Sequence, residues 1–407
     1  MSGNTAFWRR ADFQLYLSST AFTGIAFAMQ QLLLAWILIG ILELPATQVG
    51  LIQATVGIPG IFLMLLGGAK ADGVDPRALL IKVYLLAPLF PLFLIAVVFF
   101  EQLSVLSVLL WALCMSIVIS YSSPAQQAIL NRVAGEDLQK AVSAATAISF
   151  IVQIIGLAVA GTMEVIGLIP VLLFQLACIV LGAVTIKRLA PGESASSSTE
   201  STREKLIAGF KAVYRDKVIL ETLVINFTSS IFNAGAFMTV IPFVVRRIYD
   251  GDALTLSLLM VVFYTGATTS NFIMIRLMPL LRPGRIFLLM QLSRGVILAV
   301  MWIQPSFLIF ALAAIAWGFN MGVTLTLART IVQESASAGF RGRIMSVYRL
   351  GLLGSAPIGA LVLGWIIEVF GTLNGLLPAI AISVVLFVYG VFFSPVYNYQ
   401  SQSKPQP

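Results

Sequence analysis

The most unusual residue for chemistry is Arg294, a positive charge inside the apolar run 286–303. A charged side chain in apolar surroundings is costly, which makes Arg294 a candidate functional residue. Its guanidinium suits the attraction of an anionic organic molecule, such as one that carries a carboxylate. A structural role is the alternative, in which the long side chain extends to the edge of the apolar layer or binds a carboxylate or backbone carbonyl groups.

Uncharged polar and aromatic side chains also interrupt the apolar runs. Amides beside aromatic rings suit a ligand that is partly polar and partly apolar. Each amide has an alternative role as an interhelical hydrogen bond. The candidate binding residues are the amides Gln30, Gln31, Gln53, Gln153, Asn226, Asn233 and Asn320, with the aromatic residues Phe232, Phe237, Tyr264 and Trp317.

The residue types exclude most catalytic sites. The sequence has no His, which removes most zinc and haem sites and every His-based catalytic triad. Cys114 and Cys178 lie in apolar runs and are predicted to be small buried hydrophobic side chains. No GxxxxGK[ST] pattern for ATP is present. We therefore expect neither an enzyme nor a bound metal or cofactor.

The composition predicts a membrane protein. The 407 residues are 59% hydrophobic and 10% charged, whereas soluble proteins carry about 25% charged residues. The net charge of +8 need not indicate a nucleic-acid partner, because Lys and Arg collect in the cytoplasmic loops of membrane proteins. The first apolar run is too long for a signal peptide, and we expect it to remain as an anchor.

Twelve apolar runs predict twelve membrane-spanning helices, since a spanning helix needs about 20 mostly apolar residues. A β-barrel is excluded because the runs lack strand alternation. The predicted fold class is therefore an all-α integral membrane protein. The runs cover residues 13–42, 44–69, 83–100, 102–131, 141–163, 165–186, 222–245, 253–275, 286–303, 307–328, 346–367 and 376–393.

The distribution of Lys and Arg predicts that both termini are cytoplasmic. With this orientation, all of the 25 basic residues except Arg246, Arg247 and Arg294 fall in cytoplasmic segments. Such an asymmetry is typical of inner-membrane proteins. We expect a multi-pass protein of the bacterial inner membrane, surrounded by lipid and monomeric.

A polar linker divides the spans into two groups of six. It contains a Ser-rich stretch and then an amphipathic helix over 205–214, with Leu206, Phe210, Val213 and Tyr214 as its apolar stripe. The predicted domains are a first bundle over 1–188, a linker over 189–217, a second bundle over 218–395 and a cytoplasmic tail over 396–407.

The two halves also align as a repeat with a shift of about 204 residues. The segment Glu164-Val165-Ile166-Gly167 then falls on Glu368-Val369-Phe370-Gly371, and three charged segments align at the same shift. Duplicated six-helix halves place a substrate site between them, near the middle of the bilayer. The sequence thus predicts two pseudo-symmetric halves.

The loop after the second span resembles the cytoplasmic motif of the major facilitator superfamily. It places Gly68 before Ala71-Asp72 and then Arg77, although Gly73 and Pro76 stand where the superfamily usually has arginines. The resemblance implies that Asp72 and Arg77 help to lock the cytoplasmic side. An ordinary solvated turn is the alternative.

Two further stretches resemble the enterobactin-exporter and macrolide-efflux branch of that superfamily. One begins at Ser123-Pro124, and the other contains Arg341 and Arg343 and leads to Pro357 and Gly359. The resemblance implies alternating-access efflux of a siderophore or another drug-like amphiphile, and helices 1, 4, 7 and 10 around the cavity. Gly156 and Gly161 in the fifth span, with Pro357 and Gly359 in the eleventh, are predicted to let helices pack closely. Close packing there would let helices five and eleven rock against helices eight and two.

Proton antiport is implied by the resemblance alone. No Asp or Glu lies at the middle of a predicted span, and Glu221 near the start of the seventh is the best coupling candidate. An interfacial charge is its alternative role. Other functions of the same fold are import of a nutrient, lipid flipping, or sensing without transport.

Overall fold

A computed structural model describes residues 10–71, 75–191, 202–278, 280–337 and 339–401. These residues form helices, and no β-strand occurs among them. Twelve of the helical segments are long and apolar enough to cross a membrane. The predicted all-α fold with twelve spans is confirmed.

The first six spans are built from ten helical segments. Where two or three segments follow one another without a long break, they form one span. They are α2 (Ala11–Trp36) with η1 (Ile37–Ile41), α3 (Ala46–Ala71), α4 (Pro76–Leu86) with α5 (Leu89–Phe99), α6 (Val105–Ala134) followed by η2 (Gly135–Asp137), α7 (Leu138–Gly161) with α8 (Met163–Ile166), and α9 (Leu168–Arg188).

The last six spans follow the linker helix α10 (Thr202–Arg215). They are α11 (Lys217–Gly235) with η3 (Ala236–Val240) and α12 (Ile241–Arg247), α13 (Ala253–Leu277), α14 (Pro283–Trp302), α15 (Phe307–Ser335), α16 (Arg341–Phe370), and η4 (Leu373–Leu376) with α17 (Leu377–Phe392). A short helix, η5 (Pro395–Asn398), follows the last span, and its Val396 is fully buried.

Several helices extend beyond the predicted apolar runs, because those runs stopped at the first charge. The third span begins at Pro76 and therefore includes Arg77 and Lys82, and the seventh begins at Lys217. Long basic side chains near a helix end can keep their charge in the interface while the helix continues. Pro76 stands at the first position of α4, where Asp75 accepts a hydrogen bond from the Arg77 backbone N–H at 3.0 Å.

The chain forms two compact units, and each contains one short piece of the other half of the sequence. The first unit comprises residues 1–43, 55–202 and 252–258, and the second comprises 44–54, 203–251 and 259–407. The beginning of α3 therefore belongs to the second unit, and the beginning of α13 to the first. The linker helix α10 belongs to the second unit.

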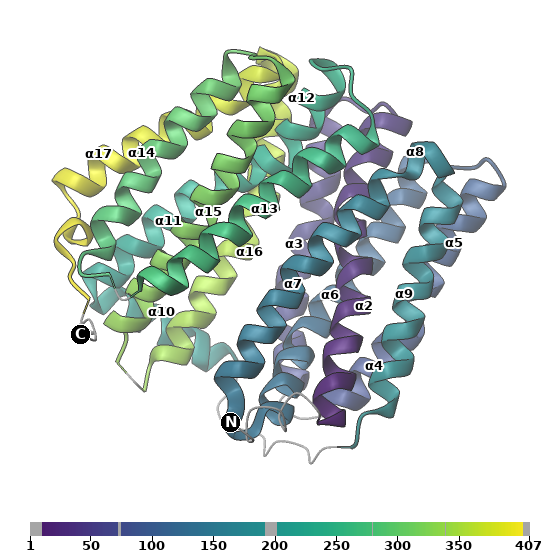
Figure 1. Cartoon of the computed structure of the whole chain (residues 1–407), viewed down its shortest axis with the longest axis horizontal. Coiled ribbons are helices and arrows are strands. Elements are labelled where there is room, and N and C mark those ends of the chain that lie inside the picture. Colours follow the sequence, from purple (N-terminus) through teal and green to yellow (C-terminus); the bar gives the residue numbers. More distant parts are fainter. Residues whose placement is uncertain (1–9, 72–74, 192–201, 279, 338, 402–407) are drawn as a thin grey trace. The chain divides into compact units, whose positions relative to one another are not determined.

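The two units repeat the same helix packing. In the first, α2 packs against α7 and α9, and in the second, α11 packs against α16 and α17 (Figure 1). Likewise α5 packs against α9, as α14 does against α17. The six-helix repeat is therefore present in the structure as well as in the sequence.

The turns after alternate spans follow the same repeat. Gly167 ends the fifth span with a φ of 92°, and Gly371 ends the eleventh with a φ of 95°. These are the last residues of the two aligned tetrapeptides, and glycine is suited to this left-handed backbone. The turns after the first, third, seventh and ninth spans also contain a residue with positive φ, namely Glu43, Glu101, Asp250 and Gln304.

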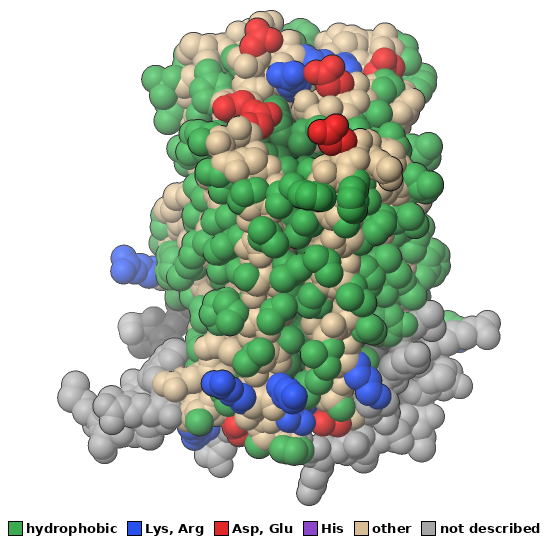
Figure 2. Space-filling view, turned by 90° about the vertical axis from the view of Figure 1, so that its right-hand side faces the viewer, with side chains coloured by type: hydrophobic (Ala, Val, Ile, Leu, Met, Phe, Trp, Pro, Cys, Tyr) green, Lys and Arg blue, Asp and Glu red, His purple; other side chains and the backbone are tan. Residues whose placement is uncertain are grey.

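The surface has the pattern of a protein that lies in a bilayer. On the face shown in Figure 2, hydrophobic side chains cover the middle, and most charged side chains lie towards the two ends. Phe62, Phe99 and Ile275 are among the large apolar side chains that are more than half exposed. Lipid tails satisfy such side chains as well as a protein core does.

Candidate functional site

The second unit contains a buried polar network centred on Arg294 of α14. Arg294 is 5% exposed. Its Nε donates to Asn320 Oδ1 at 3.0 Å, and its Nη1 donates to Ser229 Oγ at 2.7 Å. Its Nη2 donates to Gln291 Oε1 at 3.1 Å and to Thr324 Oγ1 at 3.3 Å. The guanidinium is therefore held by three helices, α11, α14 and α15.

Helical spacing brings these polar side chains to one place. Asn226, Ser229 and Asn233 follow one another at three and four residues on α11, so they share one face. Gln291 stands three residues before Arg294 on α14, and Thr324 stands four residues after Asn320 on α15. Each of the three helices thus turns a short polar stripe towards the guanidinium.

The charge of Arg294 is not balanced by an acid. All four acceptors are neutral oxygens, and no carboxylate in the part of the chain that the structure describes bonds to the guanidinium. A buried cation held only by dipoles keeps a net positive field in its surroundings. The four bonds use four of the five N–H donors of the guanidinium. One N–H donor of the guanidinium is therefore not used by these four bonds.

Three polar atoms on the same helices have no hydrogen-bond partner among the described residues. They are Asn226 Nδ2, Asn233 Oδ1 and Gln291 Nε2, and each belongs to a residue that is less than a tenth exposed. Buried polar groups are nearly always hydrogen-bonded, to protein or to water. Unpartnered amides beside a buried guanidinium are suited to a polar ligand or to ordered water.

An aromatic cluster lies one helical turn from this network. Phe237 stacks on Phe263 with ring centroids 4.2 Å apart, and it meets Tyr264 and Trp317 edge to face at 5.7 and 5.9 Å. Phe237 is four residues after Asn233 on the same span, and Trp317 is three residues before Asn320. The aromatic rings therefore continue the polar stripes of α11 and α15. The polar network and the aromatic cluster are therefore neighbours along two helices.

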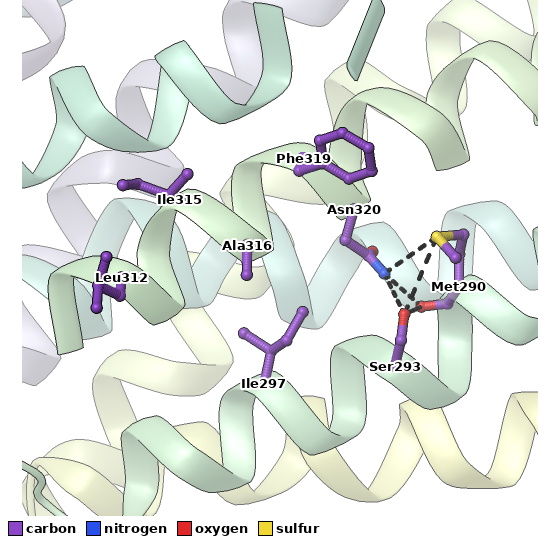
Figure 3. Close-up of a pocket in the computed structure, with 8 residues that line it drawn as sticks. All are labelled: Met290, Ser293, Ile297, Leu312, Ile315, Ala316, Phe319 and Asn320. Atoms are coloured by element: carbon purple, nitrogen blue, oxygen red, sulfur yellow. Dashed lines mark hydrogen bonds between the residues drawn. The ribbon is translucent and has the colours of Figure 1, made fainter. Parts of the chain in front are cut away.

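Asn320 connects the network to a groove between α14 and α15. The groove has a volume of about 400 Å³ and is lined by apolar side chains, including Ile297, Leu312 and Ile315. Figure 3 shows Asn320 above Ser293 and Met290 at one end of it, where Asn320 Nδ2 donates to Ser293 Oγ and to the Met290 carbonyl, both at 2.7 Å. One amide thus bonds to the groove lining with its nitrogen and to Arg294 with its oxygen.

The structure brings six of the predicted binding residues together in these two neighbouring clusters and leaves the others elsewhere. Asn233, Phe237, Tyr264, Arg294, Trp317 and Asn320 belong to the network or to the aromatic cluster, and Asn226 lies on the same stripe of α11. Phe232, on the same helix, is only partly buried. Sequence reasoning missed Ser229, Phe263, Gln291 and Thr324. The spacing of three or four residues from a predicted member was the signal that could have found them.

The amides of the first unit form hydrogen bonds between helices. Gln153 of α7 donates to Gln31 of α2 at 3.0 Å. Gln30 accepts from the buried Gln175 of α9 at 3.2 Å. Gln175 also donates to the Ala26 carbonyl at 3.0 Å. These bonds join α2 to α7 and α9.

Gln53, at the beginning of α3, belongs to the second unit. Its Nε2 donates to the Met238 carbonyl at 3.1 Å, and its Oε1 accepts from the Thr239 hydroxyl at 2.7 Å. Both partners lie in η3, the π-helical segment that also contains Phe237. A π-helix inside a span frequently marks a functional site, because it changes the direction of the following side chains.

The predicted glycines lie where helix backbones meet. A Cβ on Gly359 would meet the Ile231 carbonyl oxygen, and one on Gly235 would meet Gly359, so α11 and α16 touch at their backbones. Gly156 lies against Ile25 and Ala28 of α2 in the same way. Pro357 is buried inside α16. These contacts support close packing at Gly156 and Gly359.

Two helix contacts correspond to each other under the repeat, namely α3 with α16 and α7 with α13. In the second unit, Gly50 of α3 lies against Ala360 and Gly364 of α16. In the first unit, Gly161 of α7 lies against Ser257 of α13, whose hydroxyl donates to the Leu157 carbonyl at 2.8 Å. These are the pairs of helices two with eleven and five with eight, for which the sequence predicts movement.

The residues predicted to control the cytoplasmic side lie at helix ends. Arg77 Nη2 donates to the Lys187 carbonyl at the end of α9, at 2.7 Å, and Arg132 donates to the Ala190 carbonyl at 3.0 Å. Cations near a helix C-terminus stabilise its free carbonyl groups. Gly68 lies in α3, and Asp72 lies outside the described residues. Arg341 is exposed at the start of α16, two residues before Arg343.

Glu221 pairs with a tyrosine. Tyr389 of α17 donates its hydroxyl to Glu221 Oε1 at 3.0 Å, whereas Glu221 Oε2 is buried with no hydrogen-bond partner in the described chain. Within the same residues, no group of three or more Cys, Asp or Glu lies close enough to hold a metal ion.

Comparison with known proteins identifies the family to which this chain belongs. The profile of the transmembrane secretion effector family matches residues 2–406. The chain belongs to that family. No curated protein matches it at the level of sequence.

Solved structures of transporters have the same fold as this family member. The nucleoside transporter NupG is 14% identical and has a TM-score of 0.75, over 96% of this chain and 100% of its own. A bacterial homologue of the human lysosomal transporter Spinster is 14% identical with a TM-score of 0.74, over 98% and 100%. A D-xylose–proton symporter is 12% identical with a TM-score of 0.72, over 95% and 99%. The chain is thus a multi-pass membrane protein with the major facilitator fold.

Proposed function

We propose that this protein exports a small amphiphilic organic anion across the bacterial inner membrane by alternating access. The observation that carries the proposal is the buried guanidinium of Arg294. No carboxylate among the described residues bonds to it, and it lies near an aromatic cluster. An anionic group would bind at the guanidinium, while the apolar part of the same molecule would contact Phe237 and Trp317. A siderophore with carboxylate or catecholate groups has this chemistry.

Export is favoured over import by the family, whose description is that of a secretion effector. The solved structures contribute the fold alone, because they are 12–15% identical to this chain. The orientation with both termini cytoplasmic is supported by the distribution of Lys and Arg. The enterobactin-exporter and macrolide-efflux branch remains a proposal on the resemblance of its motifs.

Proton antiport is the proposed energy source. Glu221 supports it, because its Oε2 is a buried carboxylate oxygen with no hydrogen-bond partner among the described residues and thus offers a position for a proton. The hydroxyl of Tyr389 would hold the other oxygen in both protonation states. Movement of helices two and eight against helices eleven and five would open and close the cavity.

The first experiment compares a strain that lacks the gene with its parent. Spent medium and cell extract are analysed by untargeted mass spectrometry after growth with and without iron. We expect an anionic amphiphile to disappear from the medium and accumulate in the cells. Accumulation only under iron starvation identifies a siderophore, accumulation regardless of iron identifies another cargo, and unchanged secretion of all anions refutes the proposed export.

Lipid flipping is a second candidate, which the groove between α14 and α15 favours. The groove is lined by apolar side chains and reaches a polar group at Asn320, as an acyl chain with its headgroup would require. Proteoliposomes with a fluorescent phospholipid test it, because a flippase exposes the inner-leaflet dye to an added quencher. Protection of that dye equal to that in empty liposomes excludes this candidate.

A further inference from the structure

Gln53, at the beginning of α3, bonds to a break in the α-helical pattern of the seventh span. Pro242 lies at the start of α12 and has no N–H, so the Met238 carbonyl four residues before it has no partner in the α-helical register. Gln53 Nε2 donates to this carbonyl at 3.1 Å. A proline inside a spanning helix is tolerated where the freed carbonyl finds another donor, and Gln53 supplies such a donor.

The break coincides with the π-helical segment η3. At its end the Ile241 N–H bonds to the Ala236 carbonyl, which lies five residues before it instead of four. A π-helical turn therefore contains an extra residue, and the side chains on either side of it are turned relative to an α-helix. Phe237 lies in this segment. The direction of its ring thus depends on the turn that Gln53 holds.

A second hydrogen bond fixes the orientation of the Gln53 amide. The Thr239 hydroxyl, on a residue with no exposed surface, donates to Gln53 Oε1 at 2.7 Å. The Met238 carbonyl can only accept, so the amide must present its nitrogen there and its oxygen to Thr239. Gln53 therefore bonds two successive residues of η3. An apolar side chain of similar length could form neither bond.

The aromatic cluster depends on the position of Phe237. The Phe237 ring is stacked on Phe263 of α13 and meets Trp317 of α15 edge to face. Phe237 is 8% exposed, so its ring is enclosed by these neighbours. Aromatic pairs have preferred geometries. A change in the direction of the Phe237 ring would therefore alter both contacts.

The beginning of α3 is attached to the second unit at two further points. The Ala46 N–H donates to Glu368 Oε2, at the end of α16, at 3.0 Å. Gly50 lies against the Ala360 carbonyl oxygen of α16. From residue 55 onwards, α3 belongs to the first unit. Because the helix is continuous, a movement of the first unit would act on Gln53 through α3.

We propose that Gln53 is a positioning residue that couples the attachment of α3 to the aromatic cluster. While α3 is attached, Gln53 holds η3, and Phe237 stays stacked on Phe263. When α3 leaves, the Met238 carbonyl loses its donor and the Phe237 ring moves. This movement would release the apolar part of the cargo. The inference rests on the proposed function, in which these rings contact the cargo, but its test requires no cargo.

The test is fluorine NMR of the full-length chain, labelled with fluorotryptophan, in detergent. Trp317 reports on Phe237, because a nearby aromatic ring shifts the resonance of a fluorine atom. The resonance that is lost in Trp317→Phe identifies Trp317 among the six tryptophans. We expect this resonance to shift in Q53M, whose side chain has a similar length but no amide. An unshifted Trp317 resonance in folded Q53M would overturn the proposal.

The variant P242A tests the role of the Met238 carbonyl. Alanine restores the N–H four residues after Met238, so this carbonyl no longer needs Gln53. We expect the shift of the Trp317 resonance caused by Q53M to be much smaller in the P242A background than in the wild type. A shift of equal size in both backgrounds would show that Gln53 does not act through this carbonyl, and would overturn the proposal.

A matched control separates positioning from stability. Q153M removes a hydrogen bond of the same kind, from Gln153 to Gln31 in the first unit. It should lower the Tm as Q53M does and leave the Trp317 resonance unshifted. An equal shift in both variants would show that loss of stability alone moves the resonance, and would overturn the proposal. If Q53M does not fold, T239V has nearly the same shape as the wild type, lacks the donor to Gln53 Oε1, and should shift Trp317 in its place.

The variant G50V tests the coupling to α3. A Cβ at Gly50 would meet the Ala360 carbonyl oxygen, so valine pushes α3 away from α16 and leaves Gln53 itself unchanged. We expect the Trp317 resonance to move towards its position in Q53M. A shift in Q53M without one in G50V would overturn the coupling. Failure of the proposed export would leave all of these resonances as expected, so the two outcomes are distinguishable.

Discussion

Replacement of Arg294 by glutamine should abolish export and leave the fold intact. The variant removes the charge that would bind the anion and retains a shorter, neutral polar side chain. Removal of one partner from a buried, hydrogen-bonded charge pair typically weakens binding by about 2–5 kcal/mol. We therefore expect the apparent affinity for the cargo to fall by at least about 30-fold.

The structure also gives the expected effect of R294Q on stability. The four hydrogen bonds of Arg294 are lost, but their acceptors keep other partners: Gln291 Oε1 still accepts from Ser229 at 2.9 Å, and the Thr324 hydroxyl still donates to the Asn320 carbonyl at 2.8 Å. The bonds to a charged group are worth about 1.5–3 kcal/mol each. Burial of a cation without a bonded carboxylate costs several kcal/mol, so the loss of these bonds is offset in part. We expect the Tm to change by only a few degrees.

The assay combines complementation with thermal unfolding. A strain without the gene receives the wild type, R294Q, or the control R276Q, which removes an exposed arginine at the end of α13. The ratio of cargo in medium to cargo in cells is measured, and the purified proteins are compared by Tm. A structural role for Arg294 predicts the reverse result, in which the Tm of R294Q falls by more than about 10 °C and the surviving protein transports normally. Normal export by R294Q refutes the proposed role.

Three further predictions concern packing, capping and coupling. Gly359→Ala should destabilise the protein by about 1–3 kcal/mol, because its Cβ would meet the Ile231 carbonyl oxygen. The control G342A should leave the Tm unchanged, because a Cβ at that position would meet no atom within 4 Å. Asp252→Ala removes the acceptor of the Thr255 N–H bond at 2.8 Å and should cost about 1 kcal/mol at pH 7. The hydrogen bonds from Thr255 hold the pKa of Asp252 below its usual value. The stabilisation is therefore present at neutral pH and is lost as the pH falls through the folded-state pKa. If the Tm of the variant differs from that of the wild type by the same amount at pH 7 and at pH 3, this prediction is wrong. Glu221→Gln keeps an acceptor for Tyr389 and should leave transport that no longer responds to collapse of the proton gradient, whereas an unchanged response assigns coupling to another residue.

The amphipathic linker helix shows how far local sequence patterns extend. The spacing of apolar residues predicted a helix over 205–214, and α10 covers that range. The pattern did not show which apolar side chains face the core, because Val213 and Tyr214 are neighbours with opposite surroundings. That choice depends on the contact of Gly209 with α16, more than 130 residues away in the sequence.

The sequence by itself determined that this protein lies in a lipid bilayer. It also determined the number of spans and the internal repeat. These follow from local composition, because each span needs about 20 apolar residues whatever its neighbours are. The aligned tetrapeptides at Gly167 and Gly371 even marked two turns with the same left-handed backbone.

Only the tertiary structure decided which polar side chains meet. Ser229, Arg294 and Thr324 lie on three spans and are up to 95 residues apart in the sequence, yet they share one set of hydrogen bonds. In a soluble helix the apolar face identifies the core, but in a bilayer the lipid-facing side is apolar as well. The sequence of a span therefore carries little information about the direction of each face. Packing between helices fixes that direction, and with it the site.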